Sequence, residues 1–360
     1  MLLKLEPRRE PSQVMVYAAP ILALVLTLLT ALIVFTAMGV NAPLAVFDMF
    51  IAPAADSGRW PDLLLKAAPL IMIAVGLSIG FRANVWNIGA EGQYIMGAIA
   101  GTGVALAFWT QEGWWILPLM ALAGILGGMA YAAVPAFLRT RYRVSEILTS
   151  LMLTYVSVQF LYYLVRDPWK DPEGFNFPQT RMFTDWELLP RLSETSLIHY
   201  GVPIAFVVAL LAWILMERTT FGFSVRIVGL APAAARHGGF SEKRTIWLTM
   251  LIGGGLSGLA GVFEAAGPFG QLTPQFPQNY GFTAIIVAFL GRLHPLGMIL
   301  GGLLLAVTYV GGEIAQTDTG LPQAATGMFQ AALLFFLLAV DVLVRYRLTL
   351  RRPVASGARS

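Results

Sequence analysis

The stretch from residue 11 to residue 47, PSQVMVYAAPILALVLTLLTALIVFTAMGVNAPLAVF, contains no charged side chain. A transmembrane helix needs about 20 apolar residues to cross ~30 Å of hydrocarbon. The apolar region of a cleavable signal peptide is only about 7–15 residues long. We therefore interpret this stretch, which follows Lys4, Arg8 and Arg9, as a membrane helix that stays in the protein.

The composition of the whole chain indicates the same solvent. Of the 360 residues, 57% are hydrophobic and 12% are charged, whereas soluble domains carry about 25% charged residues. The sequence predicts an all-α polytopic helix bundle, formed by a single transmembrane domain over residues 1–360. Apolar runs between charged or proline-rich breaks predict about ten spans at 15–39, 63–81, 84–109, 114–137, 147–165, 200–216, 245–266, 280–291, 295–311 and 325–344.

The distribution of Lys and Arg predicts the orientation, because cytoplasmic loops are enriched in them. With both termini inside, 18 of the 24 basic residues fall on the cytoplasmic side. The outer side receives only Arg59, Arg166, Lys170, Arg181 and Arg191. The two large loops are then an outer loop at 166–199 and a basic inner loop at 217–244.

Several kinds of chemistry are excluded or disfavoured by what the sequence lacks. Without cysteine the chain has no disulfide, thiolate metal site or cysteine nucleophile. Its three histidines lie far apart, so we expect no metal site. None of the four lysines follows a glycine, which rules out a P-loop for ATP. No HExxH or GxSxG motif occurs, and we expect neither a catalytic residue nor a cofactor.

The segment from Asn84 to Tyr94, NVWNIGAEGQY, is unusually polar for a predicted span. On a helix, Asn84, Asn87, Glu91 and Tyr94 would share one face. Glu91 would lie ~13 Å past Arg82 at 1.5 Å per residue. A charge at that depth costs about 2.5–3.5 kcal/mol, so Glu91 should face protein or water. The stripe either lines a polar solute path or bonds neighbouring helices, and the residues leave both readings open.

The inner loop contains APAAARH at residues 231–237, which predicts a short helix. Pro232 suits a first turn, the alanines favour continuation, and Gly238 and Gly239 stop the helix. Such a helix could be a lever for a partner protein or an ordinary connector.

The segment from Pro268 to Asn279 combines amides with prolines and phenylalanines. It suits an uncharged hydroxylated or heterocyclic ligand, although we favour the reading as an ordinary outer loop.

Glycine is abundant and falls within the predicted spans in GxxxG pairs. Small residues four apart let two helix backbones approach closely, which is a source of packing energy in membranes. We expect these pairs to hold the bundle together. They are Gly76/Gly80, Gly97/Gly101, Gly124/Gly128, Gly254/Gly258 and Gly297/Gly301.

Two long motifs, NVWNIGAEGQYIMGA at 84–98 and YGFTAIIVAFLGRLHPLGMILGGLLL at 280–305, resemble permease subunits of bacterial ABC importers. The similar branch is the simple-sugar and nucleoside type, which is related to ribose and branched-chain amino-acid permeases. The segment GLAPAAARHGGFS at 229–241 looks like the cytoplasmic coupling segment of that family. The resemblance extends over most of the chain from about residue 60.

The resemblance implies a set of partners and a location. Such permeases work with a second, related permease, two cytoplasmic ATPase subunits and an extracytoplasmic binding protein that delivers the solute. The chain would lie in the bacterial cytoplasmic (inner) membrane, with the lipid bilayer around it and no nucleic acid as partner.

The resemblance also carries over site residues. It implies that Asn87, Glu91 and the segment 280–291 are neighbours of a translocation pathway. Together with the polar spacing described above, this predicts Asn84, Asn87, Glu91, Tyr94 and Phe282 as pathway residues. It implies ATPase contacts at Ala233, Ala234, Arg236 and Gly238.

Our main hypothesis is therefore a permease subunit of an ATP-driven importer for nucleosides or related simple sugars, which is not itself an enzyme. The alternative is a self-sufficient secondary transporter or channel for a small polar solute. The basic inner loop with its short helix discriminates between them, because a self-sufficient carrier has no need of such a lever.

Overall fold

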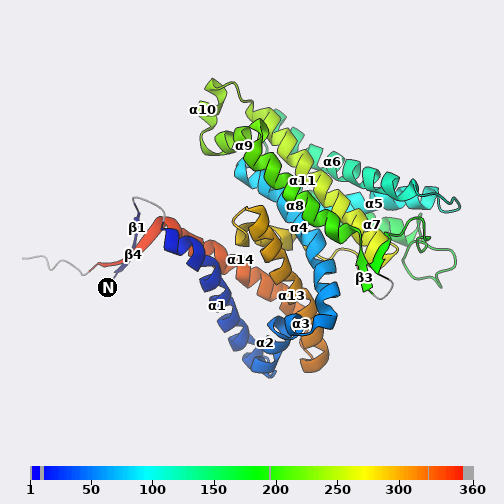
Figure 1. Ribbon diagram of the computed structural model, residues 1–360, viewed down its shortest axis with the longest axis horizontal. Helices are drawn as coiled ribbons and strands as arrows, with labels where there is room; N and C mark the ends of the chain where they lie inside the picture. Colours follow the sequence, from blue (N-terminus) through cyan, green and yellow to red (C-terminus); the bar gives the residue numbers. More distant parts are fainter. Residues whose placement is uncertain (1, 9–11, 194–195, 323, 352–360) are drawn as a thin grey trace, which may run out of the picture. The chain divides into compact units, whose positions relative to one another are not determined.

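The computed structural model describes residues 2–8, 12–193, 196–322 and 324–351, and most of them are helical (Figure 1). The first part of the chain contains β1 (Leu2–Pro7), α1 (Gln13–Ala37), α2 (Ala42–Phe50), α3 (Ala52–Ala55), η1 (Ser57–Arg59), α4 (Trp60–Arg82), α5 (Ala90–Ala107), α6 (Ile116–Tyr142) and α7 (Glu146–Arg166). The second part contains β2 (Arg191–Ser193), β3 (Ser196–His199), α8 (Gly201–Arg218), α9 (Thr220–Leu230), α10 (Pro232–His237), α11 (Glu242–Glu264), the π-helix η2 (Ala265–Phe269), α12 (Tyr280–Leu290), α13 (Pro295–Thr319), α14 (Ala324–Arg345) and β4 (Tyr346–Arg351).

Eight helices of the described chain are long and apolar enough to cross a bilayer: α1, α4, α6, α7, α8, α11, α13 and α14. The prediction of an all-α polytopic bundle is thereby confirmed. The remaining two predicted spans correspond to α5, with 18 residues, and α12, with 11 residues, and neither is among the eight. The total of ten spans stays a prediction.

The described chain divides into two compact units by packing. One unit comprises the residues up to Ala52 and those from Gly311 onward. In it α1 packs against α14, and the rings of Phe50 and Phe329 lie 4.6 Å apart. Strands β1 and β4 pair in antiparallel fashion, which requires both strands to lie on the same side of the bilayer.

The other unit runs from Pro53 to Val310 and is built around α4 and α11. Helix α4 is almost wholly buried within the chain, whereas α6, α7 and α8 each leave most of their residues accessible. These accessible residues are largely apolar, as is required of a surface that meets lipid or another membrane helix.

Close backbone contacts between α5, α6 and α11 depend on glycine. A Cβ atom added to Gly97 would lie 2.2 Å from the Cα of Gly258, and one added to Gly258 would lie 2.2 Å from the carbonyl oxygen of Gly124. Real Cβ atoms essentially never approach other atoms so closely. The expectation that the GxxxG pairs hold the bundle together is confirmed for these three helices.

Some short elements were missing from the sequence prediction. Helix α2 follows the first span because Asn41 accepts a hydrogen bond from the Leu44 N–H at 3.4 Å, as an N-cap residue does. Helix α9 lies within the inner loop, and Thr219 caps it in the same way. Side-chain caps of this kind involve neighbouring residues. The strand pairs β1–β4 and β2–β3 are not helical, so the search for apolar helices did not predict them.

Candidate functional site

Two segments of the unit from Pro53 to Val310 leave helical geometry and meet where α5 and α12 begin. Residues 83–89 link α4 to α5, and Asn84 has a φ of 57°. Residues 270–279 link η2 to α12 and end at Asn279 with a φ of 61°. In a membrane, non-helical backbone persists only where protein or water satisfies its polar groups. The junction of the two segments is therefore the candidate functional site.

Glu91 joins the two segments. Its Oε1 accepts a hydrogen bond from the Asn279 N–H at 2.9 Å, and its Oε2 accepts one from the Gly281 N–H at 2.6 Å. Both donors lie at the start of α12, where the first N–H groups of a helix have no partner within the helix and the helix dipole favours a negative charge. Glu91 is only 1% exposed, so the expectation that it faces protein is confirmed.

The junction is separated from one end of α4 by the length of α12. The other end of α12 is tied to the last residue of α4, because the Nη2 of Arg82 donates to the carbonyl oxygen of Leu293 at 2.7 Å. The 11 residues of α12 extend ~16 Å at 1.5 Å per residue. This length is about half the ~30 Å thickness of a hydrocarbon core.

The predicted common helix face of Asn84, Asn87, Glu91 and Tyr94 is wrong, because α5 begins only at Ala90. Asn84 is exposed, whereas Asn87 is buried in the non-helical segment. The structure therefore leaves only Glu91 and Tyr94 of the four on a helix.

The start of α7 holds residues 84–89 out of helical geometry. The Trp86 N–H donates to Oε1 of Glu146 at 3.2 Å, and the Ile88 N–H donates to the hydroxyl of Ser150 at 3.2 Å. Glu146 also forms an ion pair with Arg139. The two bonds from Trp86 and Ile88 join residues about 60 positions apart, so the local spacing of polar residues could not indicate them.

Asn87 and Gln93 form a reciprocal pair of amides inside the protein. The Nδ2 of Asn87 donates to Oε1 of Gln93 at 2.8 Å, and the Nε2 of Gln93 donates back to Oδ1 of Asn87 at 3.0 Å. Oδ1 of Asn87 also accepts from the Gly89 N–H at 3.2 Å, which closes the turn before α5. Gln93 was not among the predicted site residues, although it is an amide at the start of α5, two residues after Glu91.

Aromatic rings surround the start of α12. Tyr94 is wholly buried, stacks on Phe276 with ring centroids 5.0 Å apart, and meets Tyr280 edge-on at 6.0 Å. Within the described chain, the Tyr94 hydroxyl has no hydrogen-bond partner. Phe282 lies half-buried in the first turn of α12. Aromatic faces and polar groups together suit a solute that has both rings and hydroxyl groups.

The outer loop secures the non-helical segment 270–279. The Phe183 N–H donates to the carbonyl oxygen of Gly270 at 2.8 Å. Thr180 bonds Leu272 twice, through its own N–H at 3.0 Å and through its hydroxyl, which accepts from the Leu272 N–H at 3.0 Å. The segment is therefore shaped by residues about 90 positions earlier. The two interpretations of this segment, a ligand site formed by its amide side chains and an ordinary outer loop, both stay predictions.

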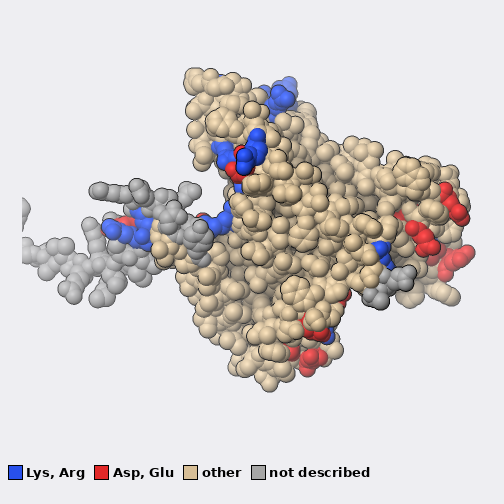
Figure 2. Space-filling view, in the orientation of Figure 1, with Lys and Arg blue, Asp and Glu red and all other residues tan. Residues whose placement is uncertain are grey.

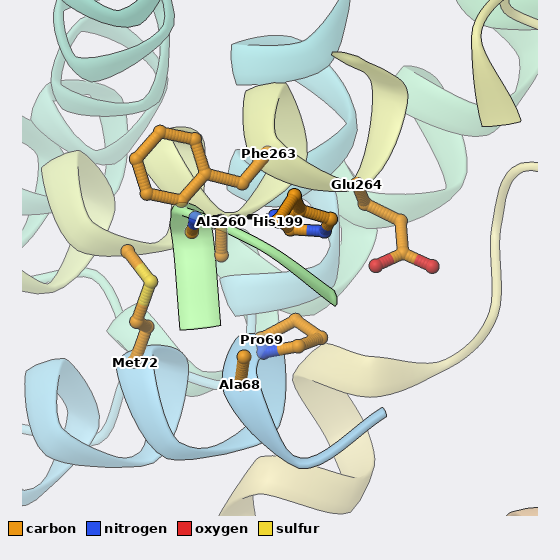
Figure 3. Close-up of a pocket in the computed structure, with 8 residues that line it drawn as sticks. Ala68, Pro69, Met72, His199, Ala260, Phe263 and Glu264 are labelled. Carbon is orange, nitrogen blue, oxygen red and sulfur yellow. Dashed lines mark hydrogen bonds between the residues drawn. The ribbon is translucent and has the colours of Figure 1, made fainter. Parts of the chain in front are cut away.

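A small pocket lies between α4, α11, the end of β3 and the start of α8 (Figure 3). Burial lowers the pKa of His199 to about 4, and its Nδ1 accepts from the Gly201 N–H at 3.1 Å. The space open to water is only ≈ 10 Å³, room for about one molecule. This pocket cannot hold a sugar. Its lining residues are Ala68, Pro69, Met72, His199, Gly201, Ala260, Phe263 and Glu264.

The predicted helix in the inner loop is confirmed as α10, which runs from Pro232 to His237. The side chains of Ala233, Ala234 and Arg236 are exposed, as is Gly238. Ala235 faces inward and is 1% exposed.

The surface charge differs between the two ends of this unit. Lys and Arg gather around the α9 and α10 end, and Asp and Glu gather around the loop after α7 (Figure 2). Helix α10 therefore presents exposed alanines at the basic end of this unit, and its cytoplasmic orientation stays a prediction.

A bundle of membrane helices in which two interrupted segments meet has the architecture of a membrane transport protein. The family described as "Branched-chain amino acid transport system / permease component" matches residues 61–338. The chain belongs to this family. It is a multi-pass membrane protein and a transport component, not an enzyme.

Known relatives are similar over most or nearly all of the chain. A glucose ABC transporter permease protein of Haloferax volcanii is 34% identical over 96% of this chain and 93% of its own. A nucleoside ABC transporter permease protein of Lactococcus lactis is 28% identical over 94% of each chain. In Lactococcus lactis a second nucleoside ABC transporter permease protein also matches, at 26% identity over 78% of this chain and 89% of its own.

Proposed function

We propose that the chain is the membrane-spanning subunit of an ATP-driven importer that takes up nucleosides or simple sugars. The observation that carries this function is the match of residues 61–338 to a permease family, in a chain that has no nucleotide-binding motif of its own. The energy source then belongs to another protein, and α10 is the surface that receives it.

The substrate class rests on the relatives and on the junction. Two relatives that match nearly the whole chain are named for glucose and for nucleosides, which share uncharged hydroxylated rings. The aromatic rings of Tyr94, Phe276 and Tyr280 and the buried amides of Asn87 and Gln93 are compatible with such solutes. Asn84, Asn87, Glu91, Tyr94 and Phe282 are proposed neighbours of the path.

The partner set is proposed on the same basis. A second, related permease is supported by the two nucleoside permeases found in one organism. Two cytoplasmic ATPase subunits would dock on Ala233, Ala234, Arg236 and Gly238, and an extracytoplasmic binding protein would deliver the solute. The complex would lie in the cytoplasmic (inner) membrane.

Reconstitution in liposomes tests the proposed function. Together with its partner subunits and ATP, the chain should accumulate guanosine or glucose, and omission of either the ATPases or ATP should abolish accumulation. An excess of a branched-chain amino acid, the control solute, should not compete. Transport by the purified chain alone without ATP would instead support the alternative of a self-sufficient carrier or channel.

Ala234→Asp tests the coupling role of α10. Ala234 is exposed on this helix, so the change should leave insertion and stability intact. A charge at the docking surface should lower solute uptake per ATP hydrolysed by at least about fivefold. This factor corresponds to the lower end of typical coupling free energies between two sites. The measurement is uptake and phosphate release in the same liposomes.

Two control substitutions isolate the effect of Ala234→Asp. Ala55→Asp introduces the same charge at another exposed alanine and should leave the ratio of uptake to hydrolysis unchanged. Ala235→Asp places the charge at a buried position and should reduce thermal stability instead. A normal ratio in an assembled Ala234→Asp complex would show that α10 is only a connector.

A further inference from the structure

Arg82, the last residue of α4, contacts two other parts of the cytoplasmic end at once. Its Nη1 lies 3.1 Å from Oε1 of Glu217 on α8, and its Nη2 donates to the Leu293 carbonyl at 2.7 Å. Its side chain is only 15% exposed, so water screens these contacts less than it screens a surface pair. The planar guanidinium can hold both acceptors in fixed directions, which an ammonium group cannot do.

The α9–α10 hairpin reaches the same point. Glu217 is shared, because its Oε2 lies 2.9 Å from Nη2 of Arg226 on α9. Gly229 packs directly on α4, since a Cβ atom added to it would lie 2.1 Å from the carbonyl oxygen of Arg82. Helix α9 ends at Leu230, next to the first turn of α10. A displacement of α10 would therefore move the groups that hold Arg82.

The contacts of Leu293 extend this connection to α12. Arg292 and Leu293 both have positive φ, 50° and 58°, in a tight turn after α12. Ring contacts also hold that end of α12. The Phe289 ring stacks on Phe81 of α4, with ring centroids 5.3 Å apart, and on Trp86 of the segment 83–89, with ring centroids 5.8 Å apart. The opposite end of α12 is held by Glu91.

We propose that Arg82 is the positioning residue that transmits movement of α10 to α12, and through α12 to the Glu91 junction. The proposal rests on the proposed function, since it needs an ATPase to move α10. Helix α12 is a short rigid rod with one end at Arg82 and the other at Glu91. A shift at the Arg82 end of α12 therefore changes the geometry of the junction, where residues 270–279 meet residues 83–89.

The absence of cysteine provides a direct readout. A single cysteine at the exposed Gln275, in the 270–279 segment, can be labelled with a membrane-impermeant maleimide in the assembled complex, with and without ATP. In the otherwise unaltered chain, ATP should change the labelling rate. Arg82→Met keeps the apolar stem but removes the donors. It should abolish that response and lower uptake per ATP by at least about fivefold, while nucleotide binding and assembly persist.

Matched variants complete the test. Arg218→Met changes the exposed arginine that ends α8, next to Glu217, and should leave both the response and the ratio of uptake to hydrolysis normal. If Arg82→Met does not assemble, Arg82→Lys and Glu217→Gln decide, because each keeps only part of the network and should weaken the response. A full response in the assembled Arg82 variants overturns the inference alone. A chain with native Arg82 that neither assembles with the ATPases nor responds to ATP overturns the proposed function as well.

Discussion

Glu91→Leu should abolish solute uptake and lower the thermal stability of the chain. The substitution leaves the N–H groups of Asn279 and Gly281 without their acceptors at the start of α12. Each unsatisfied buried donor costs about 1–3 kcal/mol, so the loss is about 2–6 kcal/mol out of a typical stability of 5–15 kcal/mol. Uptake per molecule of inserted protein, together with the melting temperature in detergent, measures both effects.

Glu91→Gln should give an intermediate result. An amide has one acceptor oxygen, whereas the carboxylate uses both oxygens to accept N–H groups. The variant should therefore insert and fold but keep only part of the uptake. Glu112→Gln, at an exposed position in the loop before α6, is the control and should be neutral. If Glu91→Leu is inserted and transports at the native rate, Glu91 neither holds the junction nor borders the path.

The second large effect is expected at Gly258, where α11 touches α5 and α6. Even Gly258→Ala places a Cβ atom 2.2 Å from the Gly124 carbonyl oxygen, so the helix backbones must separate. Overpacking costs typically ~1–3 kcal/mol and occasionally more, and no hydrophobic effect between helices offsets it within lipid. Gly258→Val should prevent a stable monodisperse protein from forming, as measured by size-exclusion chromatography in detergent.

Gly327→Ala is the matched control for this prediction. Gly327 lies in α14, and a Cβ atom added there meets nothing within 4 Å. Because alanine favours a helix over glycine by about 1 kcal/mol, the melting temperature should stay the same or rise. Equal behaviour of the two alanine variants would contradict the role assigned to close backbone contact at Gly258.

The sequence by itself determined the features that depend on neighbouring residues. Apolar runs located eight helices that can span a membrane, since the thickness of the bilayer sets a length that can be read directly. Pro232, the following alanines and the glycines after them specified α10, because caps and propensities act within one or two turns. The GxxxG spacing indicated close helix contacts for the same local reason.

Only the tertiary structure decided where helices stop and what their polar groups bind. A helical reading of residues 84–89 failed because the N–H groups of Trp86 and Ile88 donate to Glu146 and Ser150 of α7. Glu91 accepts hydrogen bonds from Asn279 and Gly281, which lie 188 and 190 residues later in the chain. Arg82 donates to Leu293, 211 residues later. No periodicity in the chain records such pairs, because they exist only once the helices have packed together.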